Sequence, residues 1–154
     1  MPSKISTENE SKAAITESLY QYAAGIDMKN PVLIASVFTP DAISDFRPAA
    51  AKAGFDYPVL KGRETITSAL MNSLGSLLTT HSVNNSRVFI EGDKAKIDAL
   101  VEAQHVPKSD VSRHYLMKNR YDVELERHNG QWLISCITVD NIWRSGDPAV
   151  LAEI

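Results

Sequence analysis

Cysteine is almost absent from this chain, because Cys136 is the only one among 154 residues. A single cysteine cannot form a disulfide within the chain, which is typical of proteins from reducing compartments. The sequence also lacks an apolar run of about 20 residues, the length that a membrane-spanning helix needs. The polar segment 1–11 has no apolar core of a signal peptide. We therefore expect a cytoplasmic protein without a membrane partner.

Basic clusters and glycine-rich loops are absent as well. The net charge is −3 and no run of Lys or Arg occurs, which argues against nucleic acid as a partner. The 7 glycines stand singly, so no loop is built to hold the phosphates of a nucleotide. No HExxH or CxxC motif supplies metal ligands. We expect no cofactor and no metal, and a small molecule as the ligand.

Apolar periodicity predicts helices in the first half of the chain. Apolar residues recur at three- and four-residue steps over 11–28 and again over 62–78. Asn30 and Pro31 predict the start of a second, shorter helix with apolar residues as far as Phe38. The Pro- and Ala-rich stretch 47–61 is predicted to be a loop that covers a cavity.

The second half alternates apolar and polar residues, as strands do. Four long strands are predicted, over 79–90, 94–106, 112–127 and 131–143. Asn129 and Gly130 form the strongest hairpin signal in the chain. This order predicts an α+β fold in which three N-terminal helices pack on a strongly curved antiparallel or mixed sheet, forming a cone with an internal pocket. Residues 1–10 are predicted to be a flexible N-terminus, and 11–154 a single domain.

Two histidines share the faces of the first predicted hairpin with apolar residues. His81 lies on the strand face of Val83, and His105 on that of Val101. Taken alone, each is more often a structural residue than a catalytic base. Asp27 falls at the end of the first helix, where it is exposed, caps the second helix, or reaches into the cavity to orient a histidine.

Several short strings, in this order, resemble the SnoaL-like, ketosteroid-isomerase-like superfamily of cystatin-like α+β cone proteins. They lie at 22–27, 37–42, 60–66, 80–81, 120–125 and 129–132. The chain is most similar to the scytalone dehydratases and hexachlorocyclohexane dehydrochlorinases of that superfamily. The resemblance implies a cofactor-independent lyase or isomerase with catalytic Asp27 and His81 in hydrogen-bond contact, and His105 as a second pocket histidine. Together with the strand positions of the histidines, it predicts that all three residues line one cavity. It also implies a homo-oligomer, a trimer or a dimer.

The sequence departs from the dehydratase pattern at two positions. Ile26 and Phe46 stand where that family has substrate-polarising tyrosines, so scytalone itself is not the expected substrate. We expect the substrate to be a mid-sized apolar molecule, such as a polyketide, terpenoid or steroid, and the reaction to be an elimination. The predicted substrate-binding residues are Tyr22, Phe46, Tyr57, Asn119, Tyr121 and Trp143. The alternative is a non-catalytic binding or assembly subunit of the same fold, such as an oxygenase small subunit.

Overall fold

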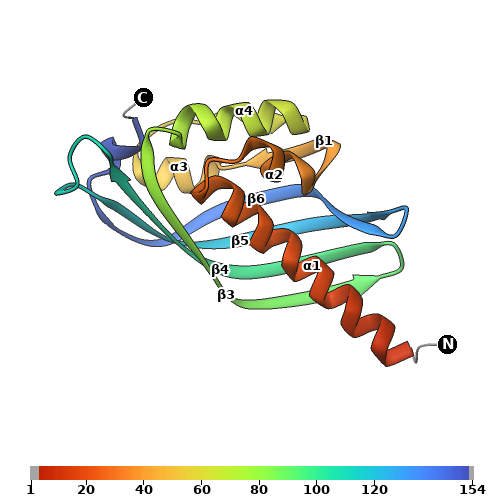
Figure 1. The fold of residues 1–154 in the computed structure, drawn as a ribbon. Helices are drawn as coiled ribbons and strands as arrows, with labels where there is room; N and C mark the ends of the chain where they lie inside the picture. The colour runs from red at the N-terminus through yellow and green to blue at the C-terminus, as the bar shows by residue number, and fades with distance from the viewer. Residues whose placement is uncertain (1–3, 153–154) are drawn as a thin grey trace.

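A computed structural model describes residues 4–152 of the chain, and the side chains of 7–152. Six strands form one mixed sheet in the order β2-β1-β6-β5-β4-β3 (Figure 1). They are β1 (Phe38–Asp45), β2 (Leu60–Lys61), β3 (Leu77–Glu91), β4 (Lys94–Pro107), β5 (Tyr115–His128) and β6 (Gln131–Gly146). The pair β1–β6 is parallel and the other pairs are antiparallel. The sheet is open, with β2 and β3 at its edges.

The helices are α1 (Lys4–Asp27), α2 (Pro31–Ser36), α3 (Arg47–Ala53) and α4 (Arg63–Leu74), followed by the 3-10 helix η1 (Pro148–Ala152). Figure 1 shows α1, α2 and α4 on one side of the sheet, and α3 at the end away from the N-terminus. The predicted α+β fold is confirmed. None of the helices in the described range is long and apolar enough to cross a membrane.

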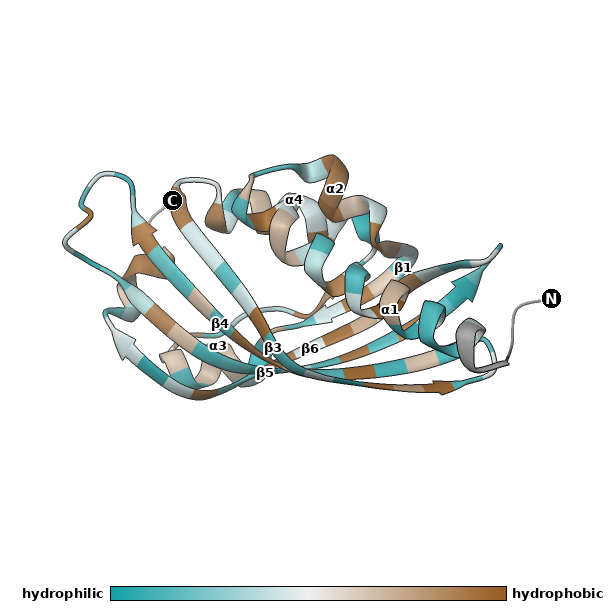
Figure 2. Ribbon diagram, turned by 60° about the horizontal axis from the view of Figure 1, so that its bottom comes forward, coloured by the Kyte–Doolittle hydropathy of each residue, from teal (hydrophilic) through white to brown (hydrophobic). Residues whose placement is uncertain are grey.

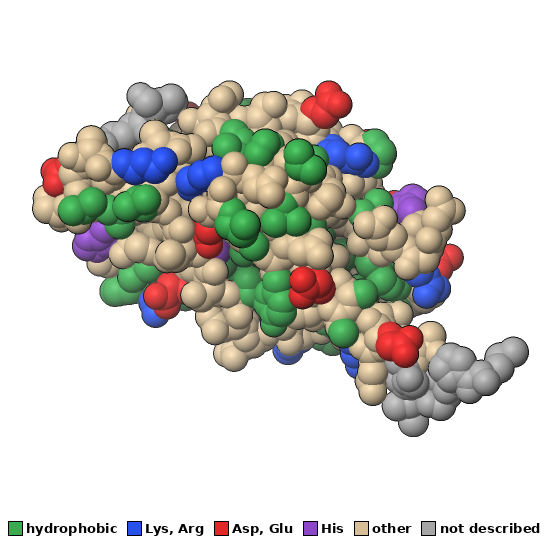
Figure 3. All heavy atoms as spheres, viewed as in Figure 1, with side chains coloured by type: hydrophobic (Ala, Val, Ile, Leu, Met, Phe, Trp, Pro, Cys, Tyr) green, Lys and Arg blue, Asp and Glu red, His purple; other side chains and the backbone are tan. Residues whose placement is uncertain are grey.

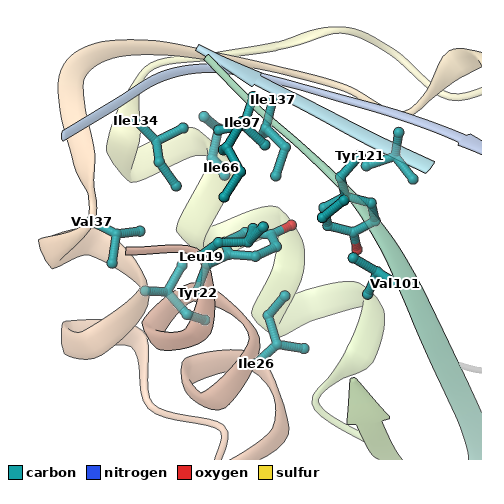
Figure 4. Packing of buried hydrophobic residues seen from close by; sticks show 14 of the residues in the cluster. Leu19, Tyr22, Ile26, Val37, Ile66, Ile97, Val101, Tyr121, Ile134 and Ile137 are labelled. Atoms are coloured by element: carbon teal, nitrogen blue, oxygen red, sulfur yellow. The ribbon is translucent and has the colours of Figure 1, made fainter. Parts of the chain in front are cut away.

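The buried stripe of α1 explains how this helix packs. Ile15, Leu19, Tyr22, Ala23 and Ile26 recur on one side of the helix, and each is at most 6% exposed. Along the strands, hydrophobic and hydrophilic residues alternate, so one face of the sheet meets the helices and the other meets solvent (Figure 2). The core lies between α1, α4 and the sheet (Figure 4).

Local sequence also determines where α2 begins and how it packs on the end of α1. Asn30 caps α2, because its side chain accepts a hydrogen bond from the N–H of Leu33 at 3.1 Å and Pro31 opens the helix, as predicted. A Cβ on Gly25 would lie 2.8 Å from Ile34 Cγ1, so the glycine lets α2 pack closely against α1. The close packing holds the C-terminal end of α1 in place beside β3.

Helix α1 begins at Lys4, earlier than the predicted start at residue 11, so residues 4–10 are helical rather than irregular. Residues 7–10 are exposed. Glu8 and Lys12 form an i,i+4 ion pair at 3.2 Å, and the Thr16 hydroxyl donates to the carbonyl of Lys12. Because residues 7–10 are exposed, the apolar periodicity does not indicate this part of the helix.

The loop prediction for 47–61 is wrong over 47–53, which form α3. Pro48 stands in the first turn and Gly54, with φ 93°, ends the helix in the left-handed region. Ala49 and Ala50 are fully buried, and α3 packs against β6. Consecutive alanines do not alternate with polar residues at helical spacing, so the amphipathic pattern that identified the other helices was missing here. The fold thus has four α-helices over the described residues, not three.

Two predicted helix ends also differ from the structure. Helix α4 ends at Leu74, and Leu77 belongs to β3, where it is 1% exposed. Phe38, predicted as part of the second helix, instead begins β1. In both places a buried apolar residue satisfies the helical pattern and the strand pattern equally, so periodicity alone does not separate them.

Register shifts bend the long strands around the helices. One lies in β3 at Asn85, which has φ 50°, and two lie between β5 and β6. The tight turn of the β5–β6 hairpin has positive φ at both Asn129 and Gly130, as predicted from their sequence. Because each shift reverses the face on which later residues point, these bulges decide which side chains enter the interior.

Candidate active site

Asp27 and His81 are in direct contact where the last residue of α1 meets β3. His81 Nδ1 lies 2.6 Å from Asp27 Oδ1, and the backbone N–H of His81 donates to Asp27 Oδ2 at 2.8 Å. The structure therefore places the two residues within hydrogen-bond distance, as the resemblance implied. Two separate bonds to one residue hold the carboxylate in a single orientation against the imidazole ring.

The hydrogen bonds determine the protonation of this pair. Asp27 also accepts a bond from the Thr79 hydroxyl at 3.0 Å. Burial acts to raise the pKa of Asp27, but the hydrogen bonds and charge of His81 and the bond from Thr79 outweigh it, so this pKa lies below its ordinary value. An ionised carboxylate only accepts, so His81 Nδ1 carries a hydrogen and Nε2 is the ring nitrogen left for a ligand. The His81 side chain is 4% exposed.

His105 is neutral, with its hydrogen on Nδ1 and a free lone pair on Nε2. Its Nδ1 lies 2.9 Å from the carbonyl oxygen of Tyr115, which only accepts, so Nδ1 carries the hydrogen and Nε2 is free. Burial lowers the pKa of His105 to about 4, against the opposing effect of that hydrogen bond. The rings of His81 and His105 are nearly perpendicular at 83°, with centroids 6.1 Å apart. The neutral His105 ring and the His81 ring therefore meet in this part of the structure.

Both histidines line an interior cavity of ≈ 100 Å³ between the helices and the sheet. Asp27 is not in its wall, although the sequence placed all three residues in one cavity. It lies behind His81 and faces a shallow outer depression with Lys29, Thr80 and Lys108. The carboxylate therefore contacts the imidazole without lining the cavity itself. Of these three residues, His81 and His105 are the ones placed to touch a ligand.

Five of the six predicted substrate-binding residues lie in the cavity wall: Tyr22, Phe46, Tyr57, Asn119 and Tyr121. Figure 4 shows Tyr22 from α1 and Tyr121 from the sheet projecting into the space between those elements. Their ring centroids are 6.4 Å apart. Burial raises the pKa of both phenols, and the neighbouring Tyr57 acts on Tyr22 in the same direction. Both hydroxyls are therefore protonated at neutral pH and are available as donors.

Trp143 is the exception, because it lies outside this cavity and is 53% exposed. Asn119 pairs with Asn141 but Lys118 pairs with Trp143, which leaves Ile142 as an extra residue in β6. Without that bulge, Trp143 would share the inward face of Asn141. The extra residue turns Trp143 to the outer face of the sheet, so the structure does not place it with the other predicted substrate-binding residues.

Asn119 is held by a neighbour that the sequence did not suggest. The Nδ2 of Asn141 donates to Asn119 Oδ1 at 2.9 Å, and both residues are at most 2% exposed. Because the Asn119 oxygen is occupied by this donor, its amide NH₂ is the group left for a ligand. Asn141 is fixed in turn by a bond from its Nδ2 to the carbonyl of Trp143 at 3.0 Å.

Other cavity residues were not predicted as site residues. They include Phe55, Leu70, Leu74, Met117 and Leu151. Met117 stands two residues before Asn119 on one strand face, so strand alternation alone was enough to find it. Phe55 and Leu151 come from a connection and from η1, where no periodicity points inward. Among the described residues, no three His, Cys, Asp or Glu side chains are placed to hold a metal ion.

The comparisons with known proteins agree with this architecture. The sequence profile of the SnoaL-like domain matches residues 7–138, so the chain belongs to the SnoaL-like domain family. No functionally curated protein matches the sequence.

Solved structures extend the likeness in fold. The protein Kfla4162 from Kribbella flavida is 24% identical with a TM-score of 0.84, and the match covers 94% of this chain and 99% of that one. A scytalone dehydratase-like protein from Novosphingobium aromaticivorans is 20% identical with a TM-score of 0.76, and the match covers 90% of this chain and 89% of that one. The hexachlorocyclohexane dehydrochlorinase LinA-type3 from Novosphingobium barchaimii is 22% identical with a TM-score of 0.74, covering 90% and 91%. The expected resemblance to these two enzyme groups is confirmed at the level of the fold.

Proposed function

We propose that this protein is a cofactor-independent lyase or isomerase that removes a proton from carbon next to a carbonyl group. One observation carries the proposal. His81 is almost fully buried against the cavity, and its Nδ1 is held by the Asp27 carboxylate, which leaves Nε2 as the ring nitrogen for a ligand. That arrangement suits a general base, because the carboxylate orients the ring, and in our proposal the neutral ring takes the proton at Nε2.

In the proposed reaction, Nε2 of His81 takes the proton and the ring becomes an imidazolium. Asp27 stabilises this charge through the 2.6 Å contact and keeps the ring in the tautomer that leaves Nε2 free. The low pKa of Asp27 supports this division of roles, because the proton stays on His81 and does not pass to the carboxylate.

The electrons of the broken C–H bond move to the carbonyl oxygen as an enolate. The Asn119 amide and the hydroxyls of Tyr22 and Tyr121 are the donors in the cavity wall that suit this oxygen. They take the place of the missing tyrosines at Ile26 and Phe46. Asn119 is the strongest of these candidates, because Asn141 already orients it before any ligand binds.

Elimination follows if the substrate carries a hydroxyl or a halogen on the next carbon. The enolate electrons return to form the C=C bond as the C–O or C–halogen bond breaks. His105 has a pKa of about 4, so at neutral pH it has no extra proton to give to the leaving group. In our proposal the His81 imidazolium returns its proton to a departing hydroxyl and releases water, or to solvent when a halide departs. His105 instead accepts a hydrogen bond from the substrate.

The cavity suits an apolar substrate with few polar groups. Its volume is below the roughly 150 Å³ of an apolar cavity that binds benzene, so a mid-sized substrate requires the covering segments to move. Dehydratases and dehydrochlorinases of this fold are among the structural neighbours, which supports elimination over isomerisation or cyclisation.

The non-catalytic alternative has less support. An oxygenase small subunit or another assembly subunit needs a broad apolar face for its partner. On the helical face drawn in Figure 3, hydrophobic side chains are interspersed with charged ones. An assembly role also gives no reason for the Asp27–His81 contact inside the fold. Homo-oligomerisation, as a trimer or a dimer, stays a prediction.

The test works with a panel of model ketones in place of the natural substrate. The protein is incubated in D₂O with cyclic ketones that carry a β-hydroxyl or a β-halogen, and mass spectrometry records deuterium uptake and loss of water or halide. We expect at least one ketone to react with wild type and not with His81→Ala. Asp27→Asn should slow the same reaction by about 10²–10⁴, because the imidazolium loses its counter-charge.

The exposed His128, whose side chain is 54% exposed, provides the matched control. His128→Ala should react like wild type. If a reactive ketone is converted equally by wild type and by a folded His81→Ala, another group is the base and the proposal is wrong.

A further inference from the structure

Lys29 adopts a backbone conformation that lysine rarely occupies. Its φ is 55°, in the left-handed region, just after the end of α1. Its N–H bonds to the carbonyl of Ile26 and the next N–H, of Asn30, bonds to Gly25, which closes the helix. Glycine or asparagine usually fills this position because other side chains are strained there. The chain therefore keeps a lysine where the backbone favours a different residue.

The side chain of Lys29 reaches the rear of the Asp27–His81 pair. Its Nζ donates to Thr79 Oγ1 at 3.0 Å, and Thr79 Oγ1 donates to Asp27 Oδ1 at 3.0 Å. A hydroxyl has one proton, and a lysine ammonium has no acceptor. Thr79 must therefore accept from Lys29, and its one proton points at the Asp27 carboxylate. Lys29 thus determines that the Thr79 hydroxyl donates its hydrogen bond to Asp27.

We propose that Lys29 is a positioning residue, which acts through Thr79 to hold the Asp27 carboxylate in the orientation that selects the His81 tautomer. The inference rests on the proposed function, in which that tautomer leaves Nε2 free as the base. Lys29 does not line the cavity, although its charge acts on His105 in the cavity wall. Its place is in the outer depression behind Asp27.

The other charged groups around Asp27 do not replace this link. Asp27 acts electrostatically on His105 and Tyr121, which line the far side of the cavity. Lys108 lies in the same outer depression as Lys29, but its Nζ bonds to the carbonyl of Gly75 at 3.3 Å. Lys108 therefore serves as a matched control, a nearby lysine of equal charge that does not bind Thr79.

The experiment measures the ring tautomer of His81 by ¹⁵N NMR at pH 7.5 in the full chain, without substrate. In wild type, His81 should be in the Nδ1–H form. Lys29→Met and Thr79→Val should each shift the ratio toward the Nε2–H form by about two- to tenfold, the effect of losing one hydrogen bond. Lys29→Arg and Lys108→Met should keep the wild-type ratio. A wild-type ratio in Lys29→Met would overturn the proposal, and a wild-type ratio in Thr79→Val would overturn the route through Thr79.

A second measurement tests whether the backbone at Lys29 is strained. Lys29→Gly and Lys29→Met both lose the bond to Thr79, but only glycine relieves the left-handed conformation. Lys29→Gly should therefore melt about 2–4 °C higher than Lys29→Met, with the same change in the His81 tautomer. Equal melting temperatures would contradict the strain on which the inference depends. Because no turnover is measured, these outcomes are separate from the fate of the proposed reaction.

Discussion

His105 makes the stability of this protein sensitive to mild acid. The residue is 4% exposed, and burial lowers its pKa from the ordinary 6.5 to about 4. Between these two pH values, the unfolded chain binds a proton at His105 and the folded chain does not. The unfolded state therefore binds more protons, so the free energy of unfolding falls as pH falls from 6.5 toward 4.

The size of the effect follows from the difference between the two pKa values. Each unit is worth about 1.36 kcal/mol, so the full loss below pH 4 is about 3 kcal/mol, and about 2.5 kcal/mol is already lost at pH 4.5. This is a large fraction of the roughly 5–15 kcal/mol by which domains are usually stable. Carboxylates with lowered pKa, such as Asp27, act in the same direction but only below their ordinary 3.8. The window from pH 6.5 to 4.5 therefore largely avoids these carboxylates, and a variant of His105 separates its effect from that of the other histidines.

Urea denaturation at pH 7.5 and pH 4.5, at one fixed protein concentration, measures this loss. His105→Phe keeps a ring in the wall but cannot titrate. It also leaves the Tyr115 carbonyl without its donor, which lowers stability at both pH values alike. The difference in unfolding free energy between pH 7.5 and pH 4.5 should therefore be about 2.5 kcal/mol smaller in His105→Phe than in wild type. The exposed His128→Gln should retain the wild-type difference.

The reasoning fails if His105→Phe and wild type lose the same free energy between the two pH values. In that case His105 is protonated in the folded state near its ordinary pKa. The role assigned to it in the proposed reaction, as an acceptor that has no extra proton to give, would then also be wrong.

Two further predictions concern the cavity. Trp143→Ala should leave kcat/KM within about twofold of wild type, since this side chain lies on the outer face. Asn119→Ala should lower kcat/KM by about 10²–10³, because it removes an oriented donor. An equal loss in both variants would contradict the placement of the cavity. Residues 54–60, which contribute Phe55 and Tyr57 to the wall, should exchange their amide hydrogens more slowly with an inhibitor bound, as measured by mass spectrometry. If residues 54–60 exchange at the same rate with and without the inhibitor, and the inhibitor is confirmed to be bound, this segment does not cover the cavity.

Local patterns in the sequence were sufficient for most of the fold. The apolar spacing of α1, the Asn30 cap and the turn at Asn129 and Gly130 each depend on residues close together in the chain. Strand alternation likewise placed His81 and His105 on the inward face, where they line the cavity. These features follow from backbone geometry that a few neighbouring residues specify.

The tertiary structure alone decided which faces and which neighbours complete the site. A one-residue bulge at Ile142 turned Trp143 outward, and a bulge carries no reliable signal in the sequence. The alanines of α3 gave no amphipathic pattern, because their burial depends on how closely β6 approaches.

The support around the catalytic candidates was equally invisible in the sequence. Lys29 and Thr79 are far apart in the chain, as are Asn119 and Asn141, yet each pair meets at hydrogen-bond distance. Such contacts depend on the register between strands and on the path of the chain after α1. Periodicity reports which face a residue occupies, but not which polar group from another element will face it there.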